Sequence, residues 1–135
     1  MKKQYFSPDQ DGFYGVYYPN SISSTKAMII MLGESSDDYM VVSAVKWLHK
    51  RGCNALAMFP VQKGAGYYDY PLEWIGHAVQ FLKTQGNQKA GIVGASTTGM
   101  MALVAASHFH SLTLTIALTP PDFITVRTSY FRNPC

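Results

Sequence analysis

The sequence contains few charged residues and only two cysteines, and both shortages limit what the protein can be. Charged side chains make up 14% of its 135 residues, and 11 Lys and Arg against 8 Asp and Glu give a net charge of +3. These charges are scattered, so neither nucleic acid nor an anionic membrane is an expected partner. Cys53 and Cys135 match neither a disulfide framework nor the spacing of metal ligands, so no resident metal is expected.

Long apolar segments are missing as well. The strictly apolar runs, such as residues 27–32 and 100–106, are far short of the roughly 20 residues that span a bilayer. The basic start, Lys2-Lys3, is followed by mixed and polar residues rather than by the apolar core of a signal peptide. We therefore expect a soluble, cytoplasmic protein with reduced thiols.

Apolar residues are nevertheless plentiful, at 47% of the chain, which is enough to build a core. The length supports one domain over residues 1–135. Within it we expect an N-terminal hairpin and connector over residues 1–25, a core over 26–121, and a tail over 122–135. The hairpin turns at Asp11-Gly12, ahead of a strand that runs from Phe13 to Tyr18.

Apolar strands and amphipathic helices alternate through the predicted core. Buried strands are expected over residues 26–32, 53–59, 89–93 and 112–118. Asp37 or Asp38 can cap the first intervening helix, Pro71 opens the second, and the third runs from Met100 to Phe109. This alternation predicts an α/β fold, a mostly parallel sheet with helices on both faces.

The segment from Gly94 to Gly99 (GASTTG) follows a predicted strand, where open α/β sheets place their functional groups. A phosphate-binding P-loop would need Lys and Ser or Thr after Gly99, but Met100 and Met101 stand there. The spacing of Gly91, Gly94 and Gly99 does not fit a dinucleotide-binding fingerprint either. Both interpretations are therefore excluded.

A nucleophile elbow fits the same segment better. In this motif a serine sits on a sharp strand-to-helix turn, with small residues two positions before and after it. Ser96 would be the nucleophile, Gly94 the preceding small residue, and Thr98 stands where glycine is expected, with Gly99 next. The elbow requires a positive φ at Ser96. Alternatively, Ser96 merely caps the helix while the glycines allow close packing, and the motif alone does not decide between these interpretations.

Three further segments carry a family resemblance. Residues 29–35 (IIMLGES) resemble a Leu-Gly-Gly-Ser loop, 51–57 (RGCNALA) an Arg-Gly-Tyr-x-Val-Leu-Ala strand entry, and 71–82 (PLEWIGHAVQFL) a Pro-Leu-Glu-Tyr helix. These motifs are similar to those of the α/β hydrolases. Within that superfamily they resemble the branch of acyl-CoA thioesterases and bile acid-CoA:amino acid N-acyltransferases, close to dienelactone hydrolases. The resemblance runs from about Lys26 to Phe123.

The resemblance implies a function and a site. Ser96 would accept the acyl group of a small ester or thioester, without a cofactor. The oxyanion hole would combine the amide of Thr97 with one in the loop of Gly33 and Glu34. The sequence departs from the branch in three places: Glu34 replaces a Gly, Thr97 stands where Lys is usual, and Thr98 replaces the second Gly of the elbow.

The rest of a catalytic triad is missing from the expected positions. In the resembled family the acid and the histidine follow two later strands, which this sequence lacks, so it looks like the first half to two-thirds of a hydrolase domain. His108 lies about 18 Å along the third helix from Ser96, and His110 follows it. His49 and His77 fall inside helices, while Asp122 could approach the rim of the site. We therefore expect this chain alone to be a poor hydrolase.

Two other functions remain open from the sequence. The chain could be a non-catalytic interaction module that kept the fold and lost the triad. It could also be a small flavodoxin-like domain that binds an anion at Thr97 and Thr98.

The last predicted strand, residues 112–118, alternates Leu or Ile with Thr or Ala and contains no Lys, Glu or Pro to discourage pairing. This edge predicts a homodimer in which two such strands meet. Alternatively, the tail that begins at Asp122 covers the edge.

Overall fold

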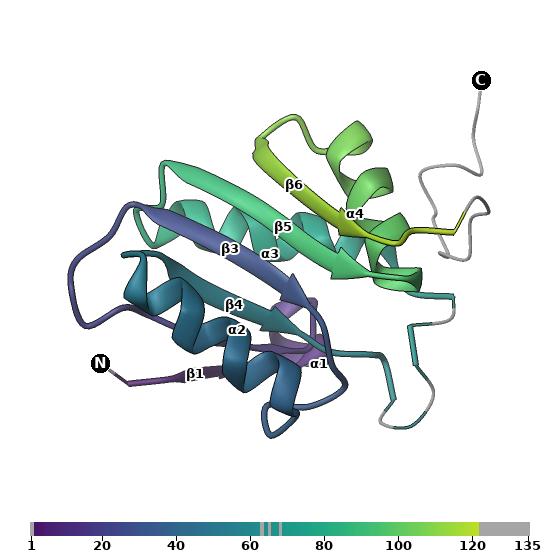
Figure 1. The fold of residues 1–135 in the computed structure, drawn as a ribbon, viewed down its shortest axis with the longest axis horizontal. Coiled ribbons are helices and arrows are strands. Elements are labelled where there is room, and N and C mark those ends of the chain that lie inside the picture. The colour runs from purple at the N-terminus through teal and green to yellow at the C-terminus, as the bar shows by residue number, and fades with distance from the viewer. Residues whose placement is uncertain (1, 63, 65, 68, 122–135) are drawn as a thin grey trace.

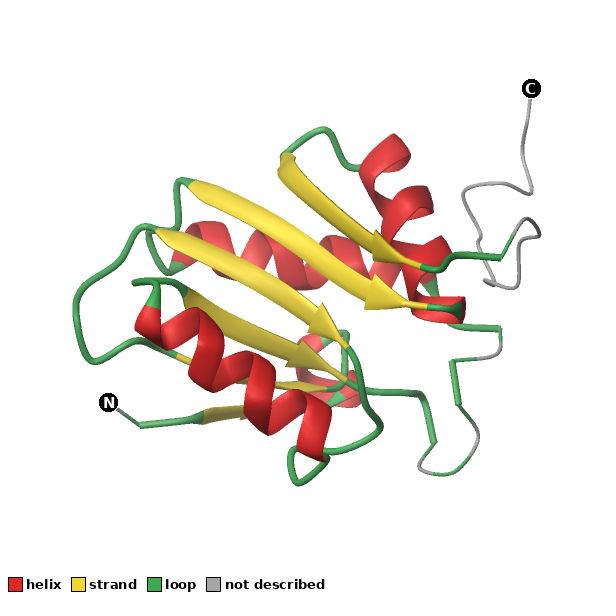
Figure 2. Cartoon of the chain, in the orientation of Figure 1, coloured by secondary structure: helices red, strands yellow, loops and turns green. Residues whose placement is uncertain are grey.

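The computed structural model describes residues 2–62, 64, 66–67 and 69–121, which form a six-stranded sheet with helices on both faces (Figures 1 and 2). In chain order its elements are β1 (Gln4–Phe6), α1 (Pro8–Asp11), β2 (Gly15–Tyr18), β3 (Lys26–Met31), α2 (Tyr39–Lys50), β4 (Asn54–Met58), α3 (Leu72–Thr84), β5 (Lys89–Ala95), α4 (Thr97–His108) and β6 (Leu112–Leu118). No helix in the described part of the chain is long and apolar enough to cross a membrane.

The strand order is β1-β2-β4-β3-β5-β6. The four neighbouring strands β4, β3, β5 and β6 are parallel to one another. Strands β1 and β2 form an antiparallel hairpin, and β2 pairs with β4 in the antiparallel direction. The predicted α/β class, with its mostly parallel sheet, is confirmed. The parallel strands all run in the same direction, and Figure 2 shows their carboxyl ends as the arrowheads at one end of the sheet.

The two faces of the sheet are covered by different helices. Figure 1 shows α2 in front of the sheet, with α3 and α4 behind it. The α2 side buries one apolar cluster, whose members include Ile30, Val41, Val45, Leu48 and Phe59. The other side buries the larger cluster, whose members include Ile29, Met31, Ile75, Leu82 and Met101. Alternate residues of β3 enter alternate clusters, as a strand buried on both faces requires.

Two boundaries differ from the sequence prediction. The N-terminal hairpin encloses the short helix α1, and its second strand begins at Gly15 rather than at Phe13. The second difference lies between β5 and α4. Strand β5 continues to Ala95, and α4 starts at Thr97 rather than at Met100. The strand is longer because Gly94 still pairs with both neighbouring strands, so a single residue, Ser96, makes the reversal.

Strand β6 lies at the edge of the sheet, as predicted. Its Leu114 and Leu118 are 54% and 49% exposed. The alternative, in which the tail from Asp122 covers this edge, falls outside the described residues.

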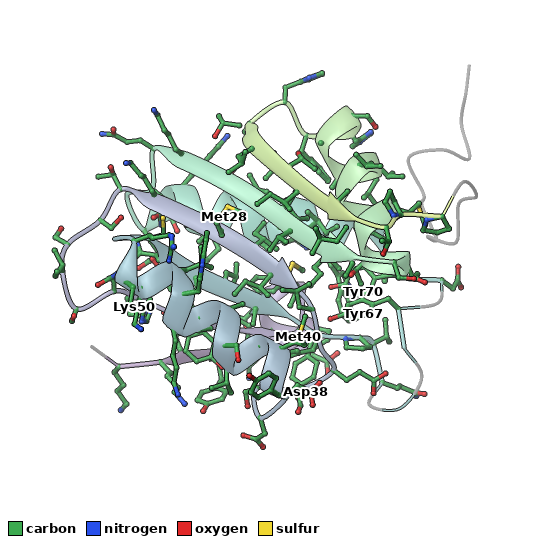
Figure 3. All side chains as sticks on the ribbon, in the orientation of Figure 1. Met28, Asp38, Met40, Lys50, Tyr67 and Tyr70 are labelled. Atoms are coloured by element: carbon green, nitrogen blue, oxygen red, sulfur yellow. The ribbon has the colours of Figure 1, made fainter. Side chains whose placement is uncertain are left out.

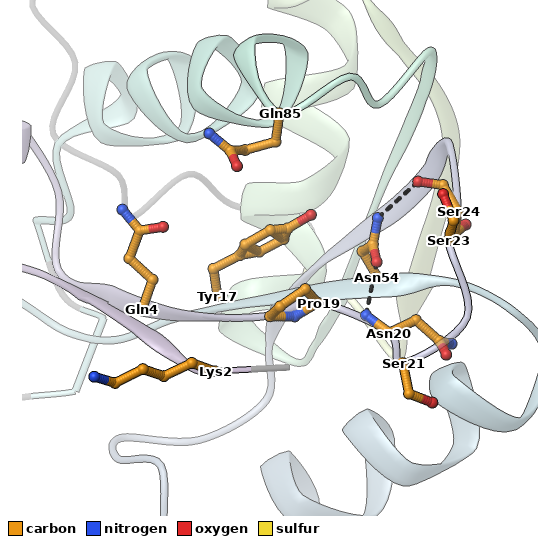
Figure 4. Close-up of a pocket in the computed structure, with 10 residues that line it drawn as sticks. All are labelled: Lys2, Gln4, Tyr17, Pro19, Asn20, Ser21, Ser23, Ser24, Asn54 and Gln85. Carbon is orange, nitrogen blue, oxygen red and sulfur yellow. Dashed lines mark hydrogen bonds between the residues drawn. The ribbon is translucent and has the colours of Figure 1, made fainter.

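Three buried asparagines hold the end of the sheet at which the parallel strands begin. Asn54 Oδ1 accepts a hydrogen bond from the Asn20 N–H at 2.8 Å, and its Nδ2 donates to Ser24 O at 3.1 Å and to Asn87 Oδ1 at 2.8 Å. This network joins the N-terminal connector to β4 and to the end of α3. Asn20, Ser24 and Asn54 of this network line a pocket of about 530 Å³ (Figure 4).

We predict that Asn54→Ala lowers the free energy of unfolding by about 2–4 kcal/mol, because it leaves buried partners unpaired. Gln85→Ala is the matched control, since Gln85 lines the same pocket but is exposed. Chemical denaturation should place the control within about 0.5 kcal/mol of the unmodified chain. Equal effects of the two changes would contradict a structural role for the network.

Candidate active site

A cavity of about 280 Å³ opens where the parallel strands end. Its walls come from the end of β3 and the following loop, from the turn between β5 and α4, and from two more distant side chains, Met40 and Tyr67. Figure 3 shows these two side chains near the arrowheads of the strands. The lining residues are Met31, Leu32, Gly33, Glu34, Met40, Tyr67, Ala95, Ser96, Thr97 and Thr98. The structure therefore brings Ser96 and Thr97 together with Gly33 and Glu34, as the sequence predicts.

Ser96 has the backbone conformation that an elbow requires. Its φ is 54° and its ψ is −120°, and its side chain is exposed. Non-glycine residues rarely adopt a positive φ, and Asp69 and Thr119 are the others in the described part of the chain. Among the described residues the Ser96 hydroxyl makes no capping hydrogen bond to α4. The predicted positive φ is confirmed, and the simple helix-cap interpretation is wrong.

Backbone contacts hold this turn in place. A Cβ built on Gly94 would lie 2.0 Å from Thr98 O, so only glycine fits there. A Cβ on Gly99 would lie 3.0 Å from Leu118 O, and the Ser96 N–H donates to the same carbonyl at 2.8 Å. The elbow is thereby fixed to the end of β6.

The threonine that replaces the second elbow glycine has a structural role. Thr98 is buried, and its Oγ1 accepts a hydrogen bond from the Ala95 N–H at 2.8 Å. Its hydroxyl has two carbonyl acceptors, Met31 O at 2.5 Å and Ala95 O at 2.9 Å. Thr98 thus joins the ends of β3 and β5 beneath Ser96.

Two backbone amides are suited to bind an oxyanion. Within the described residues, neither the Thr97 nor the Gly33 N–H has a hydrogen-bond acceptor. The Thr97 amide also lies at the N-terminus of α4, where the helix dipole favours negative charge. The Glu34 N–H differs, because it donates to Asp38 Oδ2 at 2.5 Å. The resemblance implies an oxyanion-hole amide from the loop of Gly33 and Glu34. Of these two amides, the Gly33 N–H is the one without an acceptor among the described residues.

Asp38 organises the loop between β3 and α2. It is the N-cap residue of α2, but its carboxylate makes no capping bond to the helix within the described chain. It accepts instead from the Glu34 N–H and, at 3.3 Å, from the Ser35 N–H. A Cβ on Gly33 would lie 2.7 Å from Asp38 Oδ2, so a larger residue there would displace this carboxylate. The predicted side-chain cap at Asp37 or Asp38 is therefore replaced by a brace on the loop.

Sequence reasoning missed Tyr67, which supports the same loop. Its hydroxyl lies 2.5 Å from Gly33 O and 2.6 Å from Met58 O, so it can donate to either carbonyl. Burial, and then the charges of Glu34 and Asp38, raise the pKa of Tyr67 well above its usual range. The hydroxyl thus stays a neutral donor. The loop of residues 61–70 is rich in Gly and Tyr, but nothing in that composition indicates which tyrosine reaches β3 and β4.

No described histidine lines the cavity. His49 Nε2 donates to Tyr18 O at 2.9 Å, at the edge where the parallel strands begin, and His77 Nδ1 donates to Gly12 O at 2.9 Å beside the hairpin. His108 is at the far end of α4 from Ser96. Asp122 lies outside the described residues. No group of His, Cys, Asp or Glu in the described chain could hold a metal ion.

No protein-family model and no curated protein match the sequence. Several solved structures match the fold of the chain. An esterase from Pyrococcus furiosus superposes with a TM-score of 0.68 at 20% identity, covering 87% of this chain. The α/β hydrolase GrgF from Penicillium sp. sh18 gives 0.70 at 24% identity, covering 88%. Est1E from Butyrivibrio proteoclasticus gives 0.65 at 20%, covering 89%. The chain has the α/β-hydrolase fold.

The chain spans about half the length of these α/β-hydrolase structures, namely 55%, 45% and 51% of them in the same order. The likeness establishes the fold alone.

We predict that Ser96→Gly is more stable than Ser96→Ala by about 1 kcal/mol, because glycine adopts a positive φ without strain. Ser107 provides a matched pair in an ordinary helical turn of α4. There the glycine variant should be less stable than the alanine variant by about 0.5–1 kcal/mol. Thermal or chemical unfolding of the four variants measures both differences. The same sign at both positions would argue against strain at Ser96.

A second pair of variants tests the loop brace. Tyr67→Phe should cost about 1–2 kcal/mol, because it removes the only side-chain donor that the described chain directs to Gly33 O and Met58 O. Tyr70 is buried nearby, and its hydroxyl has no hydrogen-bond partner among the described residues. Tyr70→Phe should therefore be neutral or stabilising. A Tyr70→Phe change that costs more than Tyr67→Phe would contradict this assignment.

Proposed function

We propose that this protein is an acyl-transfer domain of the serine-hydrolase type, acting on small esters or thioesters through Ser96. The observation that carries the proposal is the strained, exposed serine at the mouth of a cavity. A residue persists in such a conformation only when its surroundings impose it, and strain of this kind is concentrated at functional sites. Esterases among the solved structures of the same fold add support.

The proposed reaction begins with attack of Ser96 Oγ on the acyl carbonyl carbon. The new C–O bond converts the carbonyl oxygen into an oxyanion, which the N–H groups of Thr97 and Gly33 stabilise. Collapse of this intermediate breaks the bond to the alcohol or thiol, leaving an acyl group on Ser96. Water then attacks the ester carbon, releases the carboxylic acid and restores the hydroxyl.

The Oγ proton needs an acceptor during the attack. The described histidines are engaged or placed elsewhere, so the general base of the proposed reaction comes from outside the described residues. Such assistance typically contributes about 10²–10⁴ in rate. The 135-residue chain should therefore turn over simple esters poorly while keeping a serine that can be acylated.

A non-catalytic binding module on the same fold is the second candidate. One observation favours it: the Glu34 amide, which the resemblance places in the oxyanion loop, is already engaged by Asp38. The two functions differ in whether Ser96 reacts.

We predict that p-nitrophenyl acetate acetylates Ser96 when imidazole is supplied as the missing base, with the adduct located by peptide mass mapping. Ser96→Ala should lose this adduct, and Ser107→Ala, at the far end of α4, should keep it. Without imidazole, hydrolysis by the chain should be close to that of Ser96→Ala. An absence of any Ser96 adduct would favour the binding module. Fast turnover without imidazole, abolished by Ser96→Ala, would show that the chain already holds a base.

We also propose that the chain self-associates through β6. Its edge presents exposed Leu114 and Leu118, without charged side chains, as a template for a second strand. Sedimentation at tens of micromolar should show a dimer, and Leu114→Lys should shift it toward monomer. A monomer under these conditions would contradict the proposal and favour a covered edge.

A further inference from the structure

A carboxylate lies at the rim of the Ser96 cavity. Glu34 is half-buried and lines the cavity together with Ser96 and Thr97. The Gly64 N–H donates to Glu34 Oε2 at 2.9 Å, which fixes the carboxylate between the loop after β3 and the loop after β4. A Cβ on Gly66 would also lie 4.0 Å from Glu34 Oε1. The charge is therefore held in place and does not extend freely into solvent.

Among the described side chains that line this cavity, the formal charge has one sign. Among the described residues that line it, Glu34 is the charged one, and none is Lys, Arg or His. The carboxylate of Asp38 lies behind the same loop, bound to the Glu34 N–H. The N-terminus of α4 supplies only about half a positive charge. Among the described residues, the two carboxylates therefore outweigh the partial positive charge of this helix end.

The remaining walls are apolar and the volume is small. Leu32, Met31 and Met40 contribute hydrocarbon and thioether surface, and Tyr67 is held by its hydrogen bonds to Gly33 and Met58. Figure 3 shows Met40 and Tyr67 at this end of the sheet, with Asp38 close by. A cavity of about 280 Å³ accommodates a short acyl group together with a compact leaving group.

Resting on the proposed function, we infer that Glu34 determines specificity at this site and selects acyl donors whose leaving group is cationic or neutral over donors whose leaving group is anionic. A compact quaternary ammonium alcohol or thiol fits both the charge and the size of the cavity. A thioester of a polyanionic carrier is disfavoured, since its phosphates would approach Glu34 without a described lysine or arginine to neutralise them.

The size of the effect follows from Coulomb's law. For unit charges about 7 Å apart, the limits for bulk water and for a protein surface correspond to roughly threefold and fiftyfold in rate. Because Glu34 is partly exposed, we expect a preference of about tenfold, reduced by added salt.

The test uses three thioesters that acetylate Ser96 in the presence of imidazole and differ in the charge of the leaving thiol. Acetylthiocholine is the cationic donor, S-(3,3-dimethylbutyl) thioacetate is its neutral analogue of the same shape, and S-acetyl-2-mercaptoethanesulfonate is the anionic donor. In each case Ser96 Oγ forms the new bond to the acetyl carbon, the C–S bond breaks, and imidazole takes the Oγ proton. Rates are measured as acetylated Ser96 peptide. Each is divided by the rate at which the same donor and imidazole acetylate a free serine peptide, because the three thiols differ as leaving groups.

Glu34→Gln removes the charge but keeps an oxygen that can accept from the Gly64 N–H. The unmodified chain should react about tenfold faster with the cationic donor than with the neutral one, and slower again with the anionic one. In Glu34→Gln the three rates should converge to within about twofold. Asp37→Asn is the matched control, because Asp37 is an exposed carboxylate of the same loop that does not line the cavity. It should keep the preference.

Equal rates for all three donors in the unmodified chain, or a preference that survives in Glu34→Gln, would overturn the inference while leaving Ser96 as the nucleophile. Failure of every donor to acetylate Ser96 would instead contradict the proposed function. A loss of the preference in Asp37→Asn to the same extent as in Glu34→Gln would assign it to the general field of the loop and also overturn the role of Glu34.

Discussion

The reversal of the chain at Ser96 is the constraint on which the site depends. A strand and a helix meet there through one residue at φ 54°, which leaves no room for a side chain on Gly94. The turn is held by the Ser96 N–H on Leu118 O, and Thr98 Oγ1 joins it to the end of β3. These contacts come from three adjacent strands, β3, β5 and β6. The Thr97 N–H beside it has no acceptor among the described residues, because a helix starts immediately after the turn.

The loop after β3 places opposite demands on the site. The Gly33 N–H has no acceptor within the described residues, but Asp38 binds the neighbouring Glu34 N–H, and the Glu34 side chain adds a carboxylate at the rim. Negative charge near a developing oxyanion raises the barrier to its formation. Under the proposed specificity, the same charge attracts a cationic leaving group. If the proposed specificity holds, the Glu34 carboxylate weakens the stabilisation of the oxyanion and provides selectivity for the leaving group. Tyr67 and Asp38 stabilise the conformation of the loop.

Much of the fold was predictable because its signals are local. Continuous apolar runs identified the parallel strands, and Pro71 marked the start of α3. The glycines around Ser96 indicated the elbow because the turn excludes side chains at those positions. The start of α4 was missed, since Thr97, Thr98 and Gly99 are poor helix formers and only their tertiary contacts make them helical. The roles of Asp38 and Tyr67 were not predictable either, because their partners Glu34, Gly33 and Met58 are chosen by the packing of loops rather than by sequence spacing.

The most direct test of the central claim is a high-resolution crystal structure of the chain after reaction with a fluorophosphonate, with imidazole supplied as base. The account predicts phosphonylated Ser96 with φ near the value of 54° found here, and a phosphoryl oxygen within hydrogen-bond distance of the Thr97 N–H. An unmodified Ser96 in the β region, with its hydroxyl capping α4, would contradict the claim that the fold presents this serine as a nucleophile.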